Sequence, residues 1–289
     1  MIMKGRISCW LRGTVGGGLR LALAGLRNLF FVRECAVCGS ELDCGDASGD
    51  GVVPRDGVVP RDGVPGGGQF LCEKCLGDIP LTRFWMYSEN AAMESLAGCR
   101  VHNAASLFFY RHDSPYCEIV RQFKYGRRES LGLWAARLLG SYLASGGLYT
   151  DVQAVVPVPL HPFKRWKRGF NQAEIIARGV AEGLASRQTD ADTSRQTGEN
   201  SGRILVVPHL LRRRRYTSTQ TRRSATSRRS NVSGAFSVNH RELARLQAAG
   251  VTHILIVDDV LTTGATLSEC IHLLQDHFTV SAATLGFVE

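Results

Sequence analysis

Ile-Leu-Ile-Val-Asp-Asp-Val-Leu-Thr-Thr-Gly-Ala-Thr, residues 254–266, gives the clearest indication of the fold. Its first four residues predict a strand buried on both faces, because buried parallel strands need not alternate polar with apolar residues. We expect this strand to stop at Asp258 and Asp259, since burying two unpaired carboxylates is costly. Open α/β sheets bind ligands beyond the carboxyl ends of their strands, so the turn that follows is a candidate binding site.

The residues after this acid pair suit a phosphate monoester. Thr262, Thr263 and Thr266 bring hydroxyl groups, and Gly264 lets the backbone approach a ligand closely or adopt a positive φ. The helix expected from Ala265 offers free amide groups and a favourable dipole to an anion. The carboxylates, as acceptors, would then meet the hydroxyls of the attached sugar directly or through a divalent ion. An ordinary turn with a helix cap is the alternative.

Strand-like and helix-like segments alternate on both sides of this loop. Parallel strands need a crossover connection, usually a helix, so the alternation predicts an α/β domain over about residues 100–289 with a mostly parallel sheet flanked by helices. The expected strands are 105–110, 151–157, 254–257 and 280–288, and the expected helices are 116–125, 131–143, 171–184, 242–249 and 265–278.

A second loop, residues 155–172, is expected beside the acid pair and is strongly basic. Four cations lie within five residues around Trp166, ahead of a helix that begins near Asn171. Arginine offers paired donors to phosphate oxygens, so the loop is a candidate for contacts with a diphosphate. Cations around an aromatic ring are also typical of single-strand nucleic-acid binding. The candidate ligand contacts in this loop are His161, Lys164, Arg165 and Arg168.

Residues 257–266 resemble, at every position, the signature of type I phosphoribosyltransferases. The basic loop, together with residues 216–220 and 228–236, is similar to the ComF family of phosphoribosyltransferase-like proteins. In that family an Arg-Gly-Phe-Asn-Gln element, here residues 168–172, and an Arg-x-x-Asn element, here residues 228–231, surround the ligand site. The resemblance extends from about residue 35 to 289. It departs in two low-complexity inserts and at Arg222 and Arg223.

The resemblance implies a type I phosphoribosyltransferase fold that binds 5-phosphoribosyl 1-pyrophosphate. Asp258 and Asp259 would contact the ribose hydroxyls and serve as the catalytic pair, and magnesium would bind the diphosphate. The resemblance also implies contacts between the phosphoribosyl donor molecule and the other residues of this loop, namely Val257, Thr262, Thr263, Gly264, Ala265 and Thr266.

Two Cys-x-x-Cys pairs precede this domain, Cys35 with Cys38 and Cys72 with Cys75. Two such pairs complete a tetrahedral thiolate site for structural zinc, and a long flexible connection between them costs little free energy. Cys44 is a competing ligand. A disulfide framework and a redox pair are the alternatives considered. The ComF resemblance implies an N-terminal zinc-knuckle of this kind, and we expect such a module over residues 35–80.

Two segments are expected to be flexible inserts. Residues 45–68 contain Gly-Val-Val-Pro-Arg-Asp twice in succession, and residues 186–202 repeat Ser-Arg-Gln-Thr, in both cases without an apolar face. Residues 1–34 are interrupted by arginines and lack a small-residue cleavage site, which favours an amphipathic segment over a secretory signal. With no apolar run long enough to cross a bilayer, we expect a cytoplasmic protein without a membrane span.

The net charge of +9 comes from one part of the chain, because residues 161–229 alone carry +11. Such a cluster suits a polyanion, and a solvated loop is the alternative. Three functions follow. The first is an enzyme that transfers a phosphoribosyl group to a nitrogen acceptor. The second, implied by the ComF resemblance, is an accessory protein of DNA uptake that binds single-stranded DNA, with a DNA-uptake helicase as an expected partner. The third is a ligand sensor without turnover.

Overall fold

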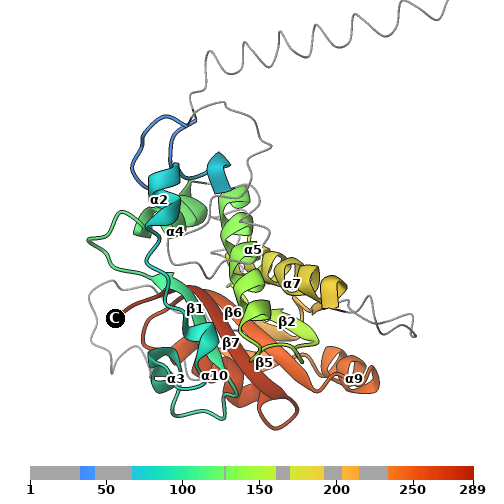
Figure 1. The fold of residues 1–289 in the computed structure, drawn as a ribbon. Coiled ribbons are helices and arrows are strands. Elements are labelled where there is room, and N and C mark those ends of the chain that lie inside the picture. The colour runs from blue at the N-terminus through green and yellow to red at the C-terminus, as the bar shows by residue number, and fades with distance from the viewer. Residues whose placement is uncertain (1–32, 43–66, 127, 161–169, 192–203, 215–233) are drawn as a thin grey trace, which may run out of the picture.

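The computed structural model of the 289-residue chain describes residues 33–42, 67–126, 128–160, 170–191, 204–214 and 234–289. An α/β domain occupies most of these residues (Figure 1). The helical elements are η1 (Gly67–Gln69), α2 (Glu73–Gly77), η2 (Phe84–Met86), α3 (Ala91–Ser95), α4 (Cys117–Tyr125), α5 (Glu129–Ser145), α7 (Gln172–Ala191), α9 (His240–Ala248) and α10 (Ala265–Leu274). The strands are β1 (Ala104–Phe109), β2 (Ala154–Pro157), β3 (Leu205–Val206), β4 (Leu211–Arg213), β5 (Phe236–Val238), β6 (His253–Leu261) and β7 (Thr279–Phe287).

Five strands form one sheet in the order β1-β7-β6-β2-β3. All four pairings in it are parallel, as the alternation of strands and helices predicted. The strand β6 lies at the centre, between β7 and β2. A separate antiparallel ribbon of β4 and β5 pairs Arg213 with Phe236.

Helices cover both faces of the sheet (Figure 1). Leu255 and Val257 of β6 belong to a core shared with α4, α5 and α7, whereas Ile254 and Ile256 belong to a core shared with α9, α10 and the ribbon. Because both faces are buried, this strand has no polar alternation. The four residues are each 0% exposed, which explains why a continuous apolar run identified the strand.

The packing of α5 on α7 depends on glycines. A β-carbon on Gly183 would lie 2.3 Å from the carbonyl oxygen of Arg137, and one on Gly140 would lie 2.4 Å from the carbonyl oxygen of Val180. The two backbones are therefore closer than side chains would permit. An ion pair between Arg137 and Glu182, at 2.5 Å, also joins the two helices.

The expectation that the central strand stops at the acid pair is wrong. On the β2 side the pairing ends at Pro157 with Val257, but on the β7 side it continues from Asp258 to Leu261. The physical reason is the apolar pair that follows the acids, since Leu261 is 2% exposed and continues the core. The carboxylates therefore lie within a strand that has lost its neighbour on one side only.

Other boundaries differ from the expectations by a few residues. The helix α10 ends at Leu274, before the expected end at residue 278, and Phe278 nevertheless packs into the core at 6% exposure. The helix α7 continues to Ala191 and so includes the first residues of the expected insert 186–202. At the end of the other expected insert, 45–68, Gly67 and Gly68 begin η1. Other residues of these inserts and residues 1–32 lie outside the described part of the chain.

Candidate ligand site and metal centre

The acid pair lies at the carboxyl end of the sheet, where β2 has ended and β6 continues. Side chains alternate along a strand, so Asp258 and Asp259 face opposite sides of the sheet. Val257 is buried beneath them, and Asp258 Oδ1 accepts a hydrogen bond from the Asp259 amide at 2.8 Å. The expectation that both acids lie together in a turn beyond the strand is therefore wrong. They lie within β6, and their side chains reach the same edge of the sheet from opposite faces.

On the face covered by α4, Lys124 forms an ion pair with Asp259. The ammonium nitrogen lies 2.9 Å from Asp259 Oδ2, and the two side chains are 20% and 18% exposed. A pair at this degree of burial is screened less than a surface pair, so it fixes the end of α4 relative to β6.

On the opposite face, Arg213 of the ribbon approaches Asp258. The guanidinium carbon lies 5.1 Å from the centre of the Phe236 ring, a cation–π arrangement that holds this side chain at the strand. Burial and the charge of Asp259 together raise the pKa of Asp258 to about 7, although the hydrogen bond from the Asp259 amide and the positive charges of Lys124 and Arg213 act in the opposite direction. Burial lowers the pKa of Arg213, while Asp258 counteracts that effect. Lys124 on one face and Arg213 on the other thus place a positive charge on each side of the acid pair.

The loop after the acids begins α10 as expected. Gly264 has φ of 71°, a left-handed conformation that favours glycine, and α10 starts at the next residue. The N-cap residue Gly264 has no side chain, so it provides no acceptor for the first-turn amides of this helix. Thr262 is exposed, while Thr263, Ala265 and Thr266 are half-buried. Gly264 itself is buried against the backbone of Ser95, the last residue of the short α3.

The start of α7 borders the same edge of the sheet. Asn171 is 6% exposed, and its side chain accepts from the Ala173 amide and donates to the Val158 carbonyl oxygen at 3.4 Å. The other predicted contacts of the basic loop, namely His161, Lys164, Arg165 and Arg168, lie outside the described residues, as does the Arg-x-x-Asn element at 228–231.

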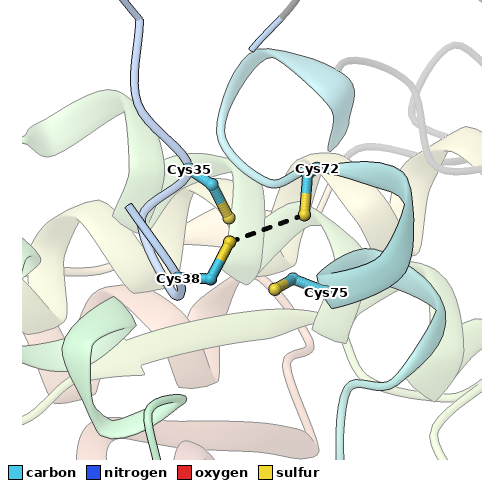
Figure 2. A group of neighbouring side chains, drawn as sticks. All are labelled: Cys35, Cys38, Cys72 and Cys75. Carbon is cyan, nitrogen blue, oxygen red and sulfur yellow. Dashed lines mark hydrogen bonds between the residues drawn. The ribbon is translucent and has the colours of Figure 1, made fainter. Parts of the chain in front are cut away.

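The four predicted metal ligands come together. The sulfur atoms of Cys35, Cys38, Cys72 and Cys75 all lie within 4.8 Å of one another and face a common centre (Figure 2). The Cys38 and Cys72 sulfurs are 3.7 Å apart. A tetrahedral site with Zn–S bonds of about 2.3 Å requires sulfurs roughly 3.8 Å apart, so this cluster could hold a metal ion of that kind. Cys44 lies outside the described residues.

Backbone turns and neighbouring side chains shape this cluster. Gly39, with φ of 74°, donates from its amide to the Cys35 carbonyl oxygen at 3.0 Å and closes the first turn. Hydrogen bonding with Ser40 lowers the pKa of Cys38 to about 6, whereas burial raises the pKa of Cys75. The described cysteines all carry free thiols, so the disulfide alternative finds no support there.

The helix α4 connects the cluster to the acid pair. The Gln122 amide donates to the carbonyl oxygen of Ala36, between two of the cysteines, at 3.0 Å. The Tyr116 hydroxyl donates to the carbonyl oxygen of Cys75 at 3.0 Å. Lys124, two residues after Gln122 on the same helix, contacts Asp259.

Lys124 is not among the site residues predicted from the sequence, and Arg213 is not predicted to lie near the acid pair. A signal for each was present. Lys124 is four residues after Val120, which is 0% exposed, so helical spacing places this lysine at the buried face of α4. Arg213 is two residues after Leu211, which is 2% exposed, so alternation places this arginine on the inner face of the ribbon once β4 is known to be a strand.

The chain is similar to bacterial proteins of competence and DNA utilization. Competence protein F of Haemophilus influenzae is 32% identical over 171 residues, which are 56% of this chain and 62% of that protein. The DNA utilization protein YhgH of Salmonella typhimurium is 32% identical over 163 residues, 55% of this chain and 61% of the relative. These similarities support the resemblance of the chain to the ComF family. YhgH of Escherichia coli K12 is 29% identical over 163 residues, with the same coverage as the Salmonella protein.

The chain spans about three fifths of the length of the curated relatives it matches. No family model matches the chain. Within the described residues, no helix combines the length and the apolarity needed to cross a membrane.

Proposed function

We propose that this protein serves in the uptake or utilization of DNA and binds single-stranded DNA. The observation that carries the proposal is the similarity to Competence protein F and to the YhgH proteins, whose names refer to competence and DNA utilization. The local charge of +11 over residues 161–229 supports it, because phosphate neutralisation dominates the affinity for nucleic acid. A DNA-uptake helicase is the partner that this role implies.

The test is binding of a single-stranded oligonucleotide as a function of salt. Arg212 and Arg214 flank Arg213 on the ribbon and are exposed, so changing both to Gln should weaken binding and reduce the salt slope by about 0.7 for each phosphate that is no longer neutralised. Arg241→Gln with Arg245→Gln, on α9, removes the same charge outside the basic cluster and is the matched control. Equal weakening in the two double variants, or no salt-dependent binding by the wild-type protein, would refute the proposal.

We also propose that the acid pair and the α10 loop bind 5-phosphoribosyl 1-pyrophosphate. The supporting observation is that two carboxylates enter the carboxyl edge of a parallel sheet directly before a helix start without a side-chain cap. The carboxylates accept the ribose hydroxyls, and the amides from Ala265 onward bind the 5-phosphate. Magnesium, when bound, neutralises the diphosphate, and the basic loop supplies further cations to it.

A ligand-dependent melting shift, measured with and without magnesium, tests this binding. The double variant Asp258→Asn and Asp259→Asn should lose the shift, because each Asn replaces one acceptor oxygen with an amide donor. Asp113→Asn, an exposed acid on the loop before α4, should keep it. A wild-type protein that shows no shift at millimolar ligand would exclude the site.

If phosphoribosyl pyrophosphate binds, the corresponding enzymatic function is transfer of its phosphoribosyl group to a nitrogen acceptor. A nitrogen nucleophile forms a bond to the anomeric carbon as the bond to the diphosphate oxygen breaks, and the diphosphate leaves with its electron pair. Release of diphosphate with a panel of bases, amines and ammonia distinguishes this enzyme from a ligand sensor. Binding without release in any of these reactions would favour the sensor.

The cysteine cluster is proposed to hold a structural zinc ion. Its support is the mutual proximity of four thiols at a spacing compatible with tetrahedral coordination. Metal analysis of purified protein should give one zinc per chain, and the double variant Cys38→Ser and Cys72→Ser should give none. Cys99→Ser, which removes a thiol outside the cluster, is the control.

A further inference from the structure

The helix α4 touches both candidate sites within nine residues. Tyr116, directly before it, and Gln122 hold the backbone of the two cysteine turns, each through a hydrogen bond of 3.0 Å. Lys124 holds Asp259 through an ion pair of 2.9 Å. The Gln122 side chain is itself fixed, because its oxygen Oε1 accepts a hydrogen bond from the Arg128 guanidinium group at 2.7 Å.

These contacts add to the core packing that fixes the position of the helix. The apolar side of α4 is packed in the main core, with Ile119, Val120 and Phe123 each at most 1% exposed. A packed helix of this length transmits strain, so a shift at its contacts with the cysteine turns is felt at Lys124. Conversely, breaking the ion pair of Lys124 relaxes the end that carries Gln122.

Lys124 can also meet a ligand directly. An ammonium group carries three donors, so its contact with Asp259 does not preclude a simultaneous contact with an anionic oxygen. Its side chain is 20% exposed, and Asp259 is expected to face the sugar hydroxyls of the ligand. A phosphorylated sugar at the acid pair therefore gives Lys124 an additional partner and holds α4 more firmly.

We propose that α4 couples the two sites, so that a metal ion in the four-cysteine cluster and an anionic sugar-phosphate ligand at the acid pair favour each other, with Lys124 as the ligand-side contact. This inference rests on the proposed binding of phosphoribosyl pyrophosphate and zinc. Because linkage is reciprocal, zinc should raise ligand affinity by the same factor by which the ligand raises zinc affinity.

The experiment measures zinc transfer from the full-length protein to a chelator, with and without phosphoribosyl pyrophosphate and magnesium. The ligand should lower the apparent zinc loss about fivefold or more in the wild-type protein. Lys124→Met and Gln122→Ala should remove most of this effect. Arg121→Met, whose partner Glu118 lies on the same helix at 2.8 Å, should retain it.

A second arm needs no ligand. Asp259→Asn removes the charge that holds Lys124, so zinc loss should be faster than in the wild type, and adding Lys124→Met to it should have little further effect. Asp113→Asn should leave zinc loss unchanged.

The outcomes separate the two ideas. If the ligand binds, by melting shift, but zinc loss is unaffected, the coupling is overturned and the ligand site stands. If the ligand does not bind, the ligand site fails, and the coupling is judged on the second arm alone. Zinc loss from Asp259→Asn equal to that from Asp113→Asn would then overturn it, as would a protein that holds no zinc.

Discussion

Gly264 lies so close to Ser95 that a β-carbon at position 264 would come within 2.6 Å of the Ser95 carbonyl oxygen. Gly264→Ala should therefore destabilise the protein in two ways, through the left-handed φ and through this backbone clash. The φ alone costs about 1–2 kcal/mol, and the clash adds to it or displaces the loop. Urea unfolding and the ligand-dependent melting shift are the measurements.

The matched control for this substitution is Gly250→Ala. Gly250 has φ of 73° but no atom within 4 Å of its would-be β-carbon, so it should show the φ cost alone. Equal loss of stability in the two variants would contradict a steric role for α3 behind the loop.

Asp258 should make stability depend on pH in the acid-to-neutral range. Its folded pKa of about 7 is above the ordinary value, so its contribution to stability is complete below about pH 4 and is lost as pH rises through 7. The free energy of unfolding of the wild type relative to Asp258→Asn should therefore fall between these limits, as measured by urea unfolding at several pH values.

Asp113 provides the comparison for that titration. The hydrogen bond from Arg111 lowers the pKa of Asp113, so its contribution to stability is lost only at more acidic pH. The difference between wild type and Asp113→Asn should be nearly constant over the window in which the Asp258→Asn difference falls. If the free energy of unfolding of the wild type relative to Asp258→Asn is also constant over this pH range, the titration of Asp258 does not make stability depend on pH.

Gly183→Ala should weaken the packing between α5 and α7. Its β-carbon would lie 2.3 Å from the Arg137 carbonyl oxygen and 2.7 Å from the Ser141 amide nitrogen, and neither backbone atom can move without moving α5. Overpacking of this kind typically costs about 1–3 kcal/mol, which denaturant unfolding resolves.

A substitution in open space tests whether that cost is specific. Gly77→Ala, at the end of α2, has nothing within 4 Å of its β-carbon and should change stability by less than about 0.5 kcal/mol. Wild-type stability in Gly183→Ala would show that the two helices can separate without cost.

Removal of zinc should lower the melting temperature of the whole domain. Cys35 and Cys75 are buried in the same core as α4 and α5, so a loosened cluster removes apolar packing from that core. Treatment with a chelator, followed by calorimetry, should show this fall in wild type and little change in Cys38→Ser with Cys72→Ser, which has no zinc to lose. A chelator effect of equal size in both proteins would mean that the metal acts elsewhere.

The central parts of the fold could be predicted because their residues have one dominant preference. The run from Ile254 to Val257 is too apolar for any exposed element, and the helical spacing that predicted α4 placed it within one residue of its start. The prediction that the four cysteines form one metal-ligand cluster followed from ligand chemistry, and the proximity of their sulfur atoms confirms that they come together.

The parts that could not be predicted depend on distant contacts. The strand β4 lies in an arginine-rich stretch without obvious apolar alternation and is stabilised by its partner β5. The extension of β6 past its acids depends on β7 beside it. Phe278 belongs to the apolar pattern of α10 but packs after the helix has ended, so the pattern extends beyond the helix. Ligand contacts of the basic loop and of the 5-phosphate loop remain predictions.

The cysteine-bearing segment shares its interior with the sheet domain. The ring of Phe70 lies 5.9 Å from the ring of Trp134 on α5, and Leu71 and Leu76 are buried in the same cluster. A shortened chain that began at β1 would leave that side of α5 uncovered and prone to self-association. Any engineering of this protein should therefore treat residues 33–42 and 67–80 as part of the scaffold, and fusion partners or tags belong at positions outside them.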